Sequence, residues 1–561
     1  MKRFRVPRRA SMVMVLTTAL ALSAAQAGPA QARHQPRPVA AGPGVFVDPT
    51  VGSSLWLKSL DPAQVTDSNS ISIIQLVYSG LVRLDDRNNV APDLAQSMPV
   101  VSKDGLTYTF TLRPNLAYAD GTPLTAADVA ASITRSLSKA ANSPNALLYL
   151  GHIKGAADWN SGKARSLTGI AAPNARTVRI ILDRPISYFL QTLTYPTSFV
   201  VKPGLAPNAD LIGPSAQFRN IGSGPFMFSR AWRYHQEMYL APNPHWYEAG
   251  RMRLKEIDVP FISTPDTAYS EYRSGQIPLA SVPSADLAAA RGSADLHSSP
   301  TLSTYYLVPN LGRDAQCKPV GCAPFDDLHF RRALLYAVDR QTLAAKILHG
   351  TVQPLCDLIP QGIAGYDPTL CALAPYDPAR ARTELALAVK DFGGHLPHEG
   401  SLSVFYPSGS QDLANVMTAL ENEWTAVGLN VAITARPQNT YLTLISQPST
   451  PFIIDNWVYD YADPQDFADN LIGAGSTYNI GNYSNSAVQS LLDRADVTPN
   501  GPARTALYVQ AQRQAMTDVA FIELYQPVSY VRWQSTIHGL VLTPAGAIPV
   551  GGDWTNVSVG A

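Results

Sequence analysis

The chain has 561 residues, of which 46% are hydrophobic and 15% charged, and its 43 basic residues equal its 43 acidic residues in number. This composition and length are typical of a globular protein with two or three domains and a large core. The balanced charge argues against a nucleic-acid-binding protein, which needs a basic face.

The first residues have the pattern of a secretory signal peptide. A basic start, Lys2–Arg9, precedes the uncharged apolar run Met12–Ala25, and small-residue cleavage sites end at Ala27 and Ala32. The apolar run is too short to span a bilayer as a permanent helix. We therefore predict that residues 1–32 direct export and are removed. Because no cysteine lies directly after the apolar run, we expect no lipid anchor and a soluble protein in a periplasm.

Strands and helices then alternate along the chain. The stretch 106–114 alternates apolar and threonine side chains, which predicts a half-buried strand. A helix follows, with Thr125 and Asp128 at the spacing of a capping box. The stretch 177–182 predicts another strand. A long helix or a helix pair is predicted over Phe325–Gly350, and its terminal glycine acts as a stop signal.

Four cysteines fit an oxidising compartment. Cys317 and Cys322 lie five positions apart, and Cys356 and Cys371 lie fifteen apart. Pairing of nearest neighbours would close two loops as disulfides. A four-thiolate zinc site is the alternative, but the sequence lacks the paired C-x2-C spacing of zinc ribbons. We therefore favour the disulfides Cys317–Cys322 and Cys356–Cys371, and we expect no metal centre.

The next elements predict an α/β sheet. Leu402–Tyr406 has the pattern of a strand, Gln411–Val427 of a helix and Val431–Thr434 of a second strand, which together make a βαβ unit with a parallel strand pair. Pro451–Trp457 predicts a further strand of the same sheet. In open α/β sheets, ligands bind beyond the carboxyl ends of the strands. The segment after Trp457 is therefore expected at the mouth of a crevice.

This segment is strongly acidic. Asp455–Phe467 holds four aspartates and four aromatic residues, and no Lys, Arg or His occurs between Pro437 and Asp493. A calcium loop would place oxygen ligands at alternate positions. The aspartates at 463, 466 and 469 are instead spaced by three, which predicts the outer face of a helix that begins after Pro464.

Asp460 differs from these aspartates because aromatic residues surround it. Trp457, Tyr459 and Tyr461 would form walls around one carboxylate. Such a site suits an ammonium group, which can pair with the carboxylate and contact the aromatic rings. The sequence therefore predicts a site for a cationic ligand at Asp460.

The motifs of common enzyme classes are absent from the sequence. It contains no GxSxG, HExxH, GxxxxGK or GxGxxG pattern. This absence favours a binding protein over an enzyme, and we expect no cofactor. A secreted hydrolase that uses two carboxylates stays open as an alternative, because paired carboxylates leave no spacing signature.

Several stretches in a fixed order carry a resemblance that covers nearly the whole mature chain. They are SLDPAQVTDSNSISIIQLVYSGLV, LTYTFTLRPNLAYADGTPLTAADV, IGSGPFMFSRAW with APNPHWYEAG, PFDDLHFRRALLYAVDR, and NWVYDYADPQDF followed by GNYSNSAVQSLLDRA. With these stretches the chain resembles the extracytoplasmic solute-binding proteins of peptide-type ABC importers, the oligopeptide- and dipeptide-binding family, family 5.

The resemblance implies an α/β fold of the periplasmic-binding-protein type. This is a two-lobed clamshell, type II-like in its large three-subdomain form, with a hinge and a ligand crevice between the lobes. Lobe 1 would comprise residues 33–302 together with 527–561, and lobe 2 residues 303–526. The protein would act as a monomer that captures a peptide, expected to be an oligopeptide, between its lobes and delivers it to the permease subunits of an ABC importer.

The resemblance also implies the site. In peptide-binding members the aspartate of a W-x-x-D motif pairs with the α-amino group of the ligand, and here that residue is Asp460, behind Trp457. The ligand backbone would bind like an added strand. Further contacts would come from Thr66, Ser68, Tyr305 and Tyr306.

Two departures from the family pattern bear on the ligand. The stretch 401–411 contains no Arg or Lys where dipeptide binders carry an arginine for the ligand carboxylate, which disfavours a dipeptide. Thr66 and Asn145 stand where oligopeptide members carry an acidic residue and a tyrosine. A non-peptide ligand on the same scaffold, such as an oligosaccharide, an opine, haem or a nickel chelate, is the alternative.

Overall fold

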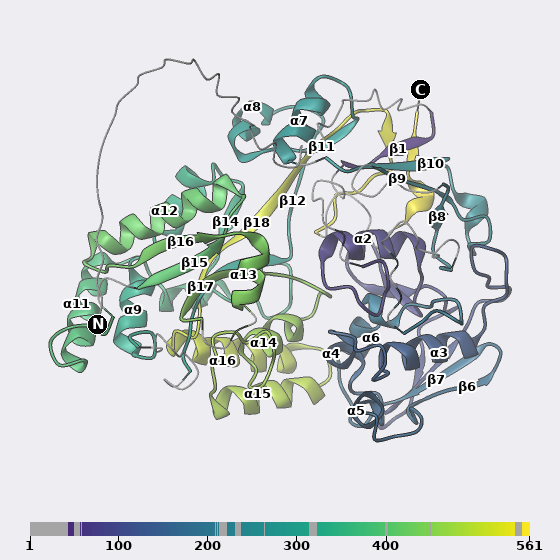
Figure 1. Cartoon of the computed structure of the whole chain (residues 1–561), viewed down its shortest axis with the longest axis horizontal. Helices are drawn as coiled ribbons and strands as arrows, with labels where there is room; N and C mark the ends of the chain where they lie inside the picture. Colours follow the sequence, from purple (N-terminus) through teal and green to yellow (C-terminus); the bar gives the residue numbers. More distant parts are fainter. Residues whose placement is uncertain are drawn as a thin grey trace, which may run out of the picture. The chain divides into compact units, whose positions relative to one another are not determined.

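In the computed structural model, three sheets of four or more strands and the helices around them carry the described residues (Figure 1). The described residues are 43–49, 57, 59–207, 209, 211, 221–230, 237–262, 264–312, 323–398, 402–445, 447, 450–544 and 553–560. None of the helices in these ranges is long and apolar enough to cross a membrane.

The N-terminal part contains a four-stranded sheet in the order β4-β5-β7-β6. Its strands are β4 (Val100–Val101), β5 (Thr107–Thr111), β6 (Ile170–Asn174) and β7 (Thr177–Ile181). The predicted strands at 106–114 and 177–182 are thus confirmed. The predicted helix is α3 (Ala126–Ser136), and the capping box between Thr125 and Asp128 is present. Around this sheet lie β2 (Val82–Leu84), β3 (Val90–Pro92), α4 (Ala146–Leu150), α5 (Ala156–Ser161) and α6 (Phe189–Thr192).

A second four-stranded sheet, β1-β10-β9-β8, lies in the same part of the chain. Its strands are β1 (Val45–Val47), β8 (Phe226–Phe228), β9 (Glu237–Pro242) and β10 (Glu256–Pro260). The hydrophobic cluster beside it includes Val531, Trp533 and Trp554 from the C-terminal end. Neighbouring elements are α2 (Ser68–Val77), α7 (Pro265–Arg273), α8 (Leu287–Ala290), β19 (Ile537–His538) and β20 (Ser558–Val559).

The largest sheet has the order β11-β18-β13-β17-β15-β16, and β12 and β14 also pair with β18. Its strands are β11 (Leu279–Ser281), β12 (Leu296–Pro300), β13 (Ser303–Pro309), β14 (Val352–Pro354), β15 (Ser403–Pro407), β16 (Ala432–Arg436), β17 (Phe452–Val458) and β18 (Ile522–Trp533). Strands β15 and β16 are parallel, and α12 (Gln411–Ala426) connects them, so the predicted βαβ unit is confirmed. Strand β17 is the predicted further strand and also runs parallel to β15.

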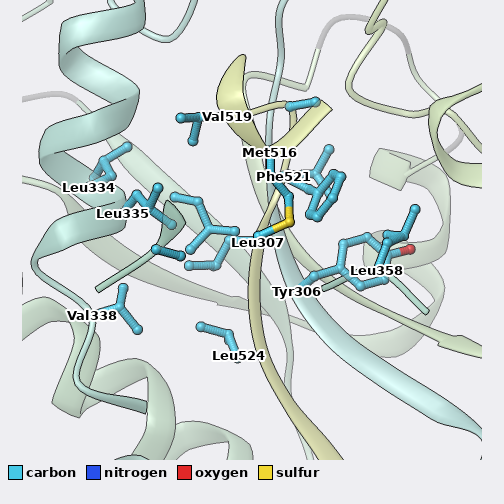
Figure 2. Close-up of a cluster of buried hydrophobic side chains, with 14 of the residues drawn as sticks. Tyr306, Leu307, Leu334, Leu335, Val338, Leu358, Met516, Val519, Phe521 and Leu524 are labelled. Atoms are coloured by element: carbon cyan, nitrogen blue, oxygen red, sulfur yellow. The ribbon is translucent and has the colours of Figure 1, made fainter. Parts of the chain in front are cut away.

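The largest hydrophobic cluster surrounds this sheet. All its buried members lie between Leu302 and Tyr525. Figure 2 shows part of it, where Tyr306 and Leu307 of β13 lie near side chains of α9 and β18. The predicted helix at 325–350 is a series of short helices, α9 (Leu328–Tyr336), α10 (Arg340–Thr342) and a π-helical turn (Leu343–Ile347), and Gly350 follows with a φ of +79°. The remaining helices are α11 (Pro378–Asp391), α13 (Gln438–Ile445), α14 (Pro464–Ile472), α15 (Ser486–Val497) and α16 (Pro502–Thr517).

Strand β18 connects two parts of the largest sheet, one with β13 and β14 and the other with β11 and β12. Its first residues pair with β13 and β14, and its last residues pair with β11 and β12. Near the middle of β18 the Thr301 amide donates to the Pro527 carbonyl at 2.9 Å, and the buried Gln526 amide group donates to the Thr301 carbonyl at 2.8 Å. The two chain segments that connect these parts, β18 and the segment of β12 and Thr301, are therefore hydrogen-bonded to each other, and they lie side by side in Figure 1.

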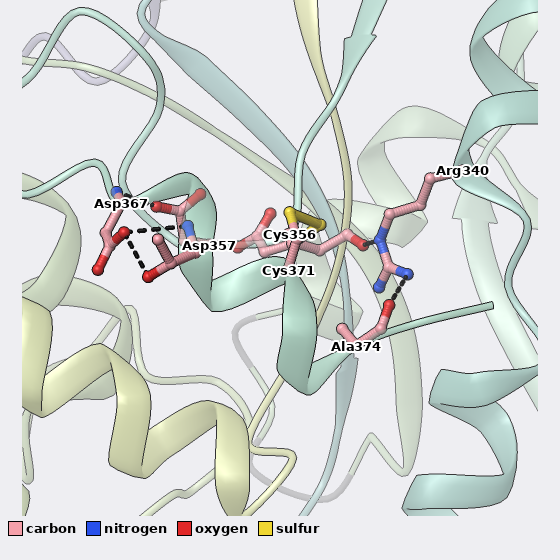
Figure 3. Close-up of a disulfide and its surroundings, with 8 residues drawn as sticks. Arg340, Cys356, Asp357, Asp367, Cys371 and Ala374 are labelled. Atoms are coloured by element: carbon pink, nitrogen blue, oxygen red, sulfur yellow. Dashed lines mark hydrogen bonds between the residues drawn. A yellow bond between two sulfur atoms is a disulfide. The ribbon is translucent and has the colours of Figure 1, made fainter. Parts of the chain in front are cut away.

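The disulfide Cys356–Cys371 is confirmed, while Cys317–Cys322 lies outside the described residues and stays a prediction. Figure 3 shows the loop that the disulfide closes, in which the Asp367 amide donates to the Asp357 carboxylate at 2.7 Å. The same loop contacts β18, because the Gln361 amide donates to the Gln526 side chain at 3.0 Å. The disulfide therefore restrains a loop that holds the middle of β18.

Replacement of both Cys356 and Cys371 by alanine should lower the free energy of unfolding by about 3 kcal/mol, because the bridge closes a loop of roughly 15 residues in the unfolded chain. A urea titration measures this loss. The matched variant with alanine at positions 317 and 322 should lose less, since that loop is shorter. Non-reducing peptide mapping checks both bridges, and a free thiol at any of the four positions would contradict the assignment.

Candidate functional site

Strand alternation separates the predicted ligand-binding residues on β13 and β17. Thr304 pairs with Trp457 and Tyr305 with Asn456, and neighbouring residues of a strand point to opposite faces. Trp457, 9% exposed, belongs to the large hydrophobic cluster, as does the buried Tyr306. Asn456 is exposed on the other face, where Tyr305 is half-buried. Of these residues, Tyr305 and Asn456 are therefore the ones that solvent or a ligand can reach.

Asp460 follows the end of β17, as predicted, and is half-buried. Its carboxylate accepts a hydrogen bond from the hydroxyl of Tyr149, which lies on α4. Its backbone amide donates to the Asp466 carboxylate at 2.9 Å, and the Trp457 indole N–H donates to the same oxygen at 3.2 Å. The W-x-x-D segment is thus held in place by a second carboxylate.

The prediction that Asp463, Asp466 and Asp469 lie on the outer face of a helix is wrong for Asp463 and Asp466, whereas Asp469 is half-buried. Both side chains are buried, Asp463 as the N-cap of α14, where it accepts from the Gln465 amide at 2.9 Å. Arg504 of α16 donates to both carboxylate oxygens of Asp463, at 2.7 and 2.8 Å. A bidentate, buried pair of this kind supplies the positive charge that the local sequence lacks.

Burial is the largest cause of the raised pKa values of Asp460 and Asp466. Burial raises the pKa of Asp460 to about 7, against the opposing effect of the Tyr149 hydrogen bond. Burial and the neighbouring Asp460 charge hold the pKa of Asp466 well above its usual range. A cation that enters beside Asp460 would stabilise the ionised carboxylate. A positively charged group beside Asp460 would thus offset the effect of burial on its carboxylate.

The other predicted site residues occupy different surroundings. Tyr461 is buried in the hydrophobic cluster of the N-terminal sheet, and its hydroxyl donates to Gln465. The Tyr459 hydroxyl donates to the Asn88 side chain at 3.1 Å. Thr66 and Ser68 are exposed around the start of α2. The structure thus brings Tyr459, Tyr461 and Asp460 to contacts with the N-terminal part of the chain.

Sequence reasoning missed Tyr149 and Tyr195 of the N-terminal part, and it named Asn145 only through the family pattern. The Tyr149 ring stacks on Tyr195 with 3.9 Å between ring centroids. Asn145, one helical turn before Tyr149, donates to the Tyr195 hydroxyl at 2.9 Å and accepts from the Tyr478 hydroxyl at 3.0 Å. The spacing of four places Asn145 and Tyr149 on one side of α4. That spacing is the only local signal, and it is common in helices.

No group of three or more His, Cys, Asp or Glu side chains that could hold a metal ion occurs among the described residues. Around Asp460 the described residues offer charge pairing, hydrogen bonding and aromatic contact.

The two sets of elements, joined by β18 and the segment before β13, are those of a two-lobed solute-binding protein with an α/β clamshell fold. Residues 89–479 match the family of bacterial extracellular solute-binding proteins, family 5 (its middle region). Because the match covers well over half of the sequence, the chain belongs to this family, whose members bind substrates outside the cytoplasm.

Relatives and solved structures agree with this family. The chain is 29% identical over 483 residues to the probable deoxycholate-binding periplasmic protein YgiS of Escherichia coli, covering 84% of this chain and 86% of YgiS. It is 24% identical over 502 residues to the oligopeptide-binding protein OppA of Bacillus subtilis, covering 87% and 89%.

Two solved structures have the same fold. The murein tripeptide binding protein MppA of Escherichia coli gives a TM-score of 0.75 at 23% identity, covering 92% of this chain and 98% of MppA. The pheromone receptor PrgZ gives 0.76 at 22% identity, covering 92% and 99%.

The raised pKa of Asp460 predicts how stability depends on pH. The folded state binds the Asp460 proton more tightly than the unfolded chain does, so ionisation of this group lowers stability as the pH rises from about 4 to about 7. Asp460→Asn removes that loss. The variant should therefore gain stability relative to the wild type as the pH rises from 5 to 8, measured by urea unfolding.

Asp120→Asn is the matched control with the opposite sign. Hydrogen bonds from Lys202 and Thr122 lower the pKa of Asp120 to about 2, so its ionised form is favoured in the folded state. This variant should lose stability relative to the wild type as the pH rises from 2 to 4. A stability difference for Asp460→Asn that does not change with pH would contradict the assignment of a raised pKa.

Proposed function

We propose that this protein is an extracytoplasmic receptor that binds a peptide between its two lobes through the free α-amino group and delivers it to an ABC importer. The observation that carries the proposal is the carboxylate of Asp460. It lies at the end of β17, and its partner from the N-terminal part is the neutral hydroxyl of Tyr149. A ligand ammonium supplies the charge that a phenol does not.

The surroundings of Asp460 support an amine over other ligand groups. The Asp466 carboxylate lies within hydrogen-bonding distance of the Asp460 amide, so a ligand anion here would meet two acidic groups. Arg504 is already engaged by Asp463. The rings of Tyr149 and Tyr195 are buried and stack on each other, so they support the Tyr149 hydroxyl that contacts Asp460.

The names of relatives divide between peptide and non-peptide ligands. OppA is named for oligopeptides and MppA for murein tripeptide, whereas YgiS is named as a probable binder of deoxycholate. Deoxycholate carries a carboxylate, which the acidic segment at Asp460 would repel. We therefore favour a peptide, and an oligosaccharide, opine, haem or nickel chelate is the alternative on the same scaffold.

The ligand backbone would extend along β17 and its neighbours. Asn456 and Val458 are exposed on the face of β17 that also carries Tyr305. Hydrogen bonds from exposed backbone would hold a peptide irrespective of its side chains. Thr66 and Ser68, both exposed at the start of α2, are proposed to contact the ligand from the other lobe.

We also propose where the protein is located, which partners it has and where its lobes begin and end. Residues 1–32 would direct export to the periplasm, where the disulfide Cys356–Cys371 is stable. The protein would act as a monomer, without catalysis or nucleic acid, and with permease subunits in the inner membrane as its partners. Lobe 1 would hold residues 33–302 and 527–561, and lobe 2 residues 303–526, with the hinge at the paired segments around Thr301 and Pro527.

Asp460→Ala should weaken the binding of a free-amine peptide by about 30-fold to several thousand-fold, because loss of one member of a buried charge pair costs about 2–5 kcal/mol. N-acetylation of the peptide should harm binding to the wild type but add little further loss in the variant. Calorimetric titration of both peptides against both proteins measures the cycle.

Asp455→Asn is the matched control within the same segment. Its carboxylate accepts from the Tyr441 hydroxyl at 3.3 Å, and an amide oxygen can keep that hydrogen bond. This variant should leave the difference between free and acetylated peptide intact. Losses that simply add in the Asp460 cycle would show that Asp460 does not bind the amine.

A further inference from the structure

A second set of contacts joins the two proposed lobes away from Asp460. The Ser187 amide donates to the Asp496 carbonyl at 2.9 Å, and the Arg184 guanidinium donates to the Asp496 carboxylate at 3.1 Å. The Ser187 hydroxyl donates to the Thr498 carbonyl, and the Asn500 side chain donates to the Ser187 carbonyl at 3.4 Å. The segment 184–188 of lobe 1 thus contacts the segment 496–500 of lobe 2 through polar groups on both sides.

This contact is suited to form and break. The Asp496 side chain is 5% exposed, and that of Arg184 is 41% exposed, so water can replace each partner when the segments separate. Separation would break these polar contacts and also the 3.5 Å hydrogen bond from the buried Tyr188 hydroxyl to the Asp496 carboxylate. Because water reaches the Arg184 side chain, solvent screening keeps the interaction free energy of this pair modest. A modest energy is what a reversible closing motion requires.

Arg504 connects this contact with the amine segment. Its guanidinium donates to the Ala495 carbonyl at 3.1 Å and to the Asn500 side chain at 3.0 Å, while it also holds Asp463. The Asp463 amide in turn donates to the carbonyl of Tyr461, the residue after Asp460, at 2.8 Å. One buried side chain therefore binds both the contact segment of lobe 2 and the start of α14.

We propose that the Arg184–Asp496 contact is a latch on lobe closure, and that Arg504 is a positioning residue that couples this latch to the segment of Asp460. The latch would strengthen binding of any ligand that requires closed lobes, without touching the ligand. It depends on the two-lobed fold and goes beyond the proposed recognition of an amine.

The expected effect follows from a two-state equilibrium. Contacts made only in the closed state raise its population, and ligand affinity rises with the population of the binding-competent state. Removal of the latch should therefore weaken all ligands by the same factor. Removal of a direct contact, by contrast, weakens only the ligands that make it.

The test is a calorimetric titration of a free-amine peptide and its N-acetylated form against Arg184→Ala, Asp496→Asn and the double variant. We expect each single variant to bind both peptides about 3- to 10-fold more weakly, and the double variant to lose no more than the larger single loss. Arg179→Ala removes a charge from an exposed position on β7 and should bind like the wild type. Unchanged affinities, or losses that add in the double variant, would overturn the latch.

The coupling through Arg504 needs its own readout. Arg504→Lys keeps the positive charge but cannot hold Asp463, Ala495 and Asn500 at once. In this background Arg184→Ala should cost less than about twofold in affinity, because the contact is no longer transmitted. An undiminished effect of Arg184→Ala would overturn the role of Arg504, whatever the thermal stability of the Arg504 variant.

These outcomes separate the latch from the proposed function. If Asp460 does not bind an amine, acetylation will not affect the wild type, yet the latch variants will still lose affinity equally for both peptides. If the latch is wrong, acetylation will still weaken the wild type while Arg184→Ala binds normally. Small-angle scattering adds a direct check, because the ligand-bound latch variants should need higher peptide concentrations to reach the compact state.

Discussion

The bidentate pair between Arg504 and Asp463 is the interaction on which the acidic segment depends. Asp460, Asp463 and Asp466 lie within seven residues, and carboxylates removed from water repel one another unless a cation or a proton intervenes. Arg504 neutralises Asp463, and burial favours the protonated form of Asp466. Asp460 accepts a hydrogen bond from Tyr149, and no cation among the described residues pairs with it.

Asp460 lies next to the strands that connect the N-terminal part with the rest of the chain. Strand β17 ends just before Asp460, and β13 and β18 beside it carry the chain between the two halves. The Asp460 carboxylate is therefore held next to β17, while Tyr149 contacts it from the N-terminal part of the chain. A ligand that pairs with Asp460 would therefore affect the contacts between these two parts of the chain.

Much of the fold could be predicted because it depends on local patterns. The βαβ unit, strand β17 and the capping box at Thr125 follow from hydrophobic period and turn residues, and all were confirmed. The disulfide Cys356–Cys371 followed from spacing and compartment. The position of Asp460 followed from the rule that ligands bind beyond strand ends.

The rest depended on contacts between distant parts of the chain. Asp463 and Asp466 were expected on the outer face of a helix because of their spacing of three, yet both are buried, and Arg504 of α16 pairs with Asp463. Tyr149 and Asp460 are 311 residues apart, so no local pattern could pair them. Trp457 was expected to form a wall around Asp460, but alternation along β17 turns its ring into the core.

The proposed function requires that the protein selects peptides by their free α-amino group. Native mass spectrometry of the purified protein, incubated with equal amounts of a peptide pool and its N-acetylated counterpart, measures this selection. We expect adducts whose masses and fragments belong to the free-amine peptides. Equal retention of both forms, or retention of a co-purified sterol, saccharide or metal chelate in preference to peptide, would contradict it.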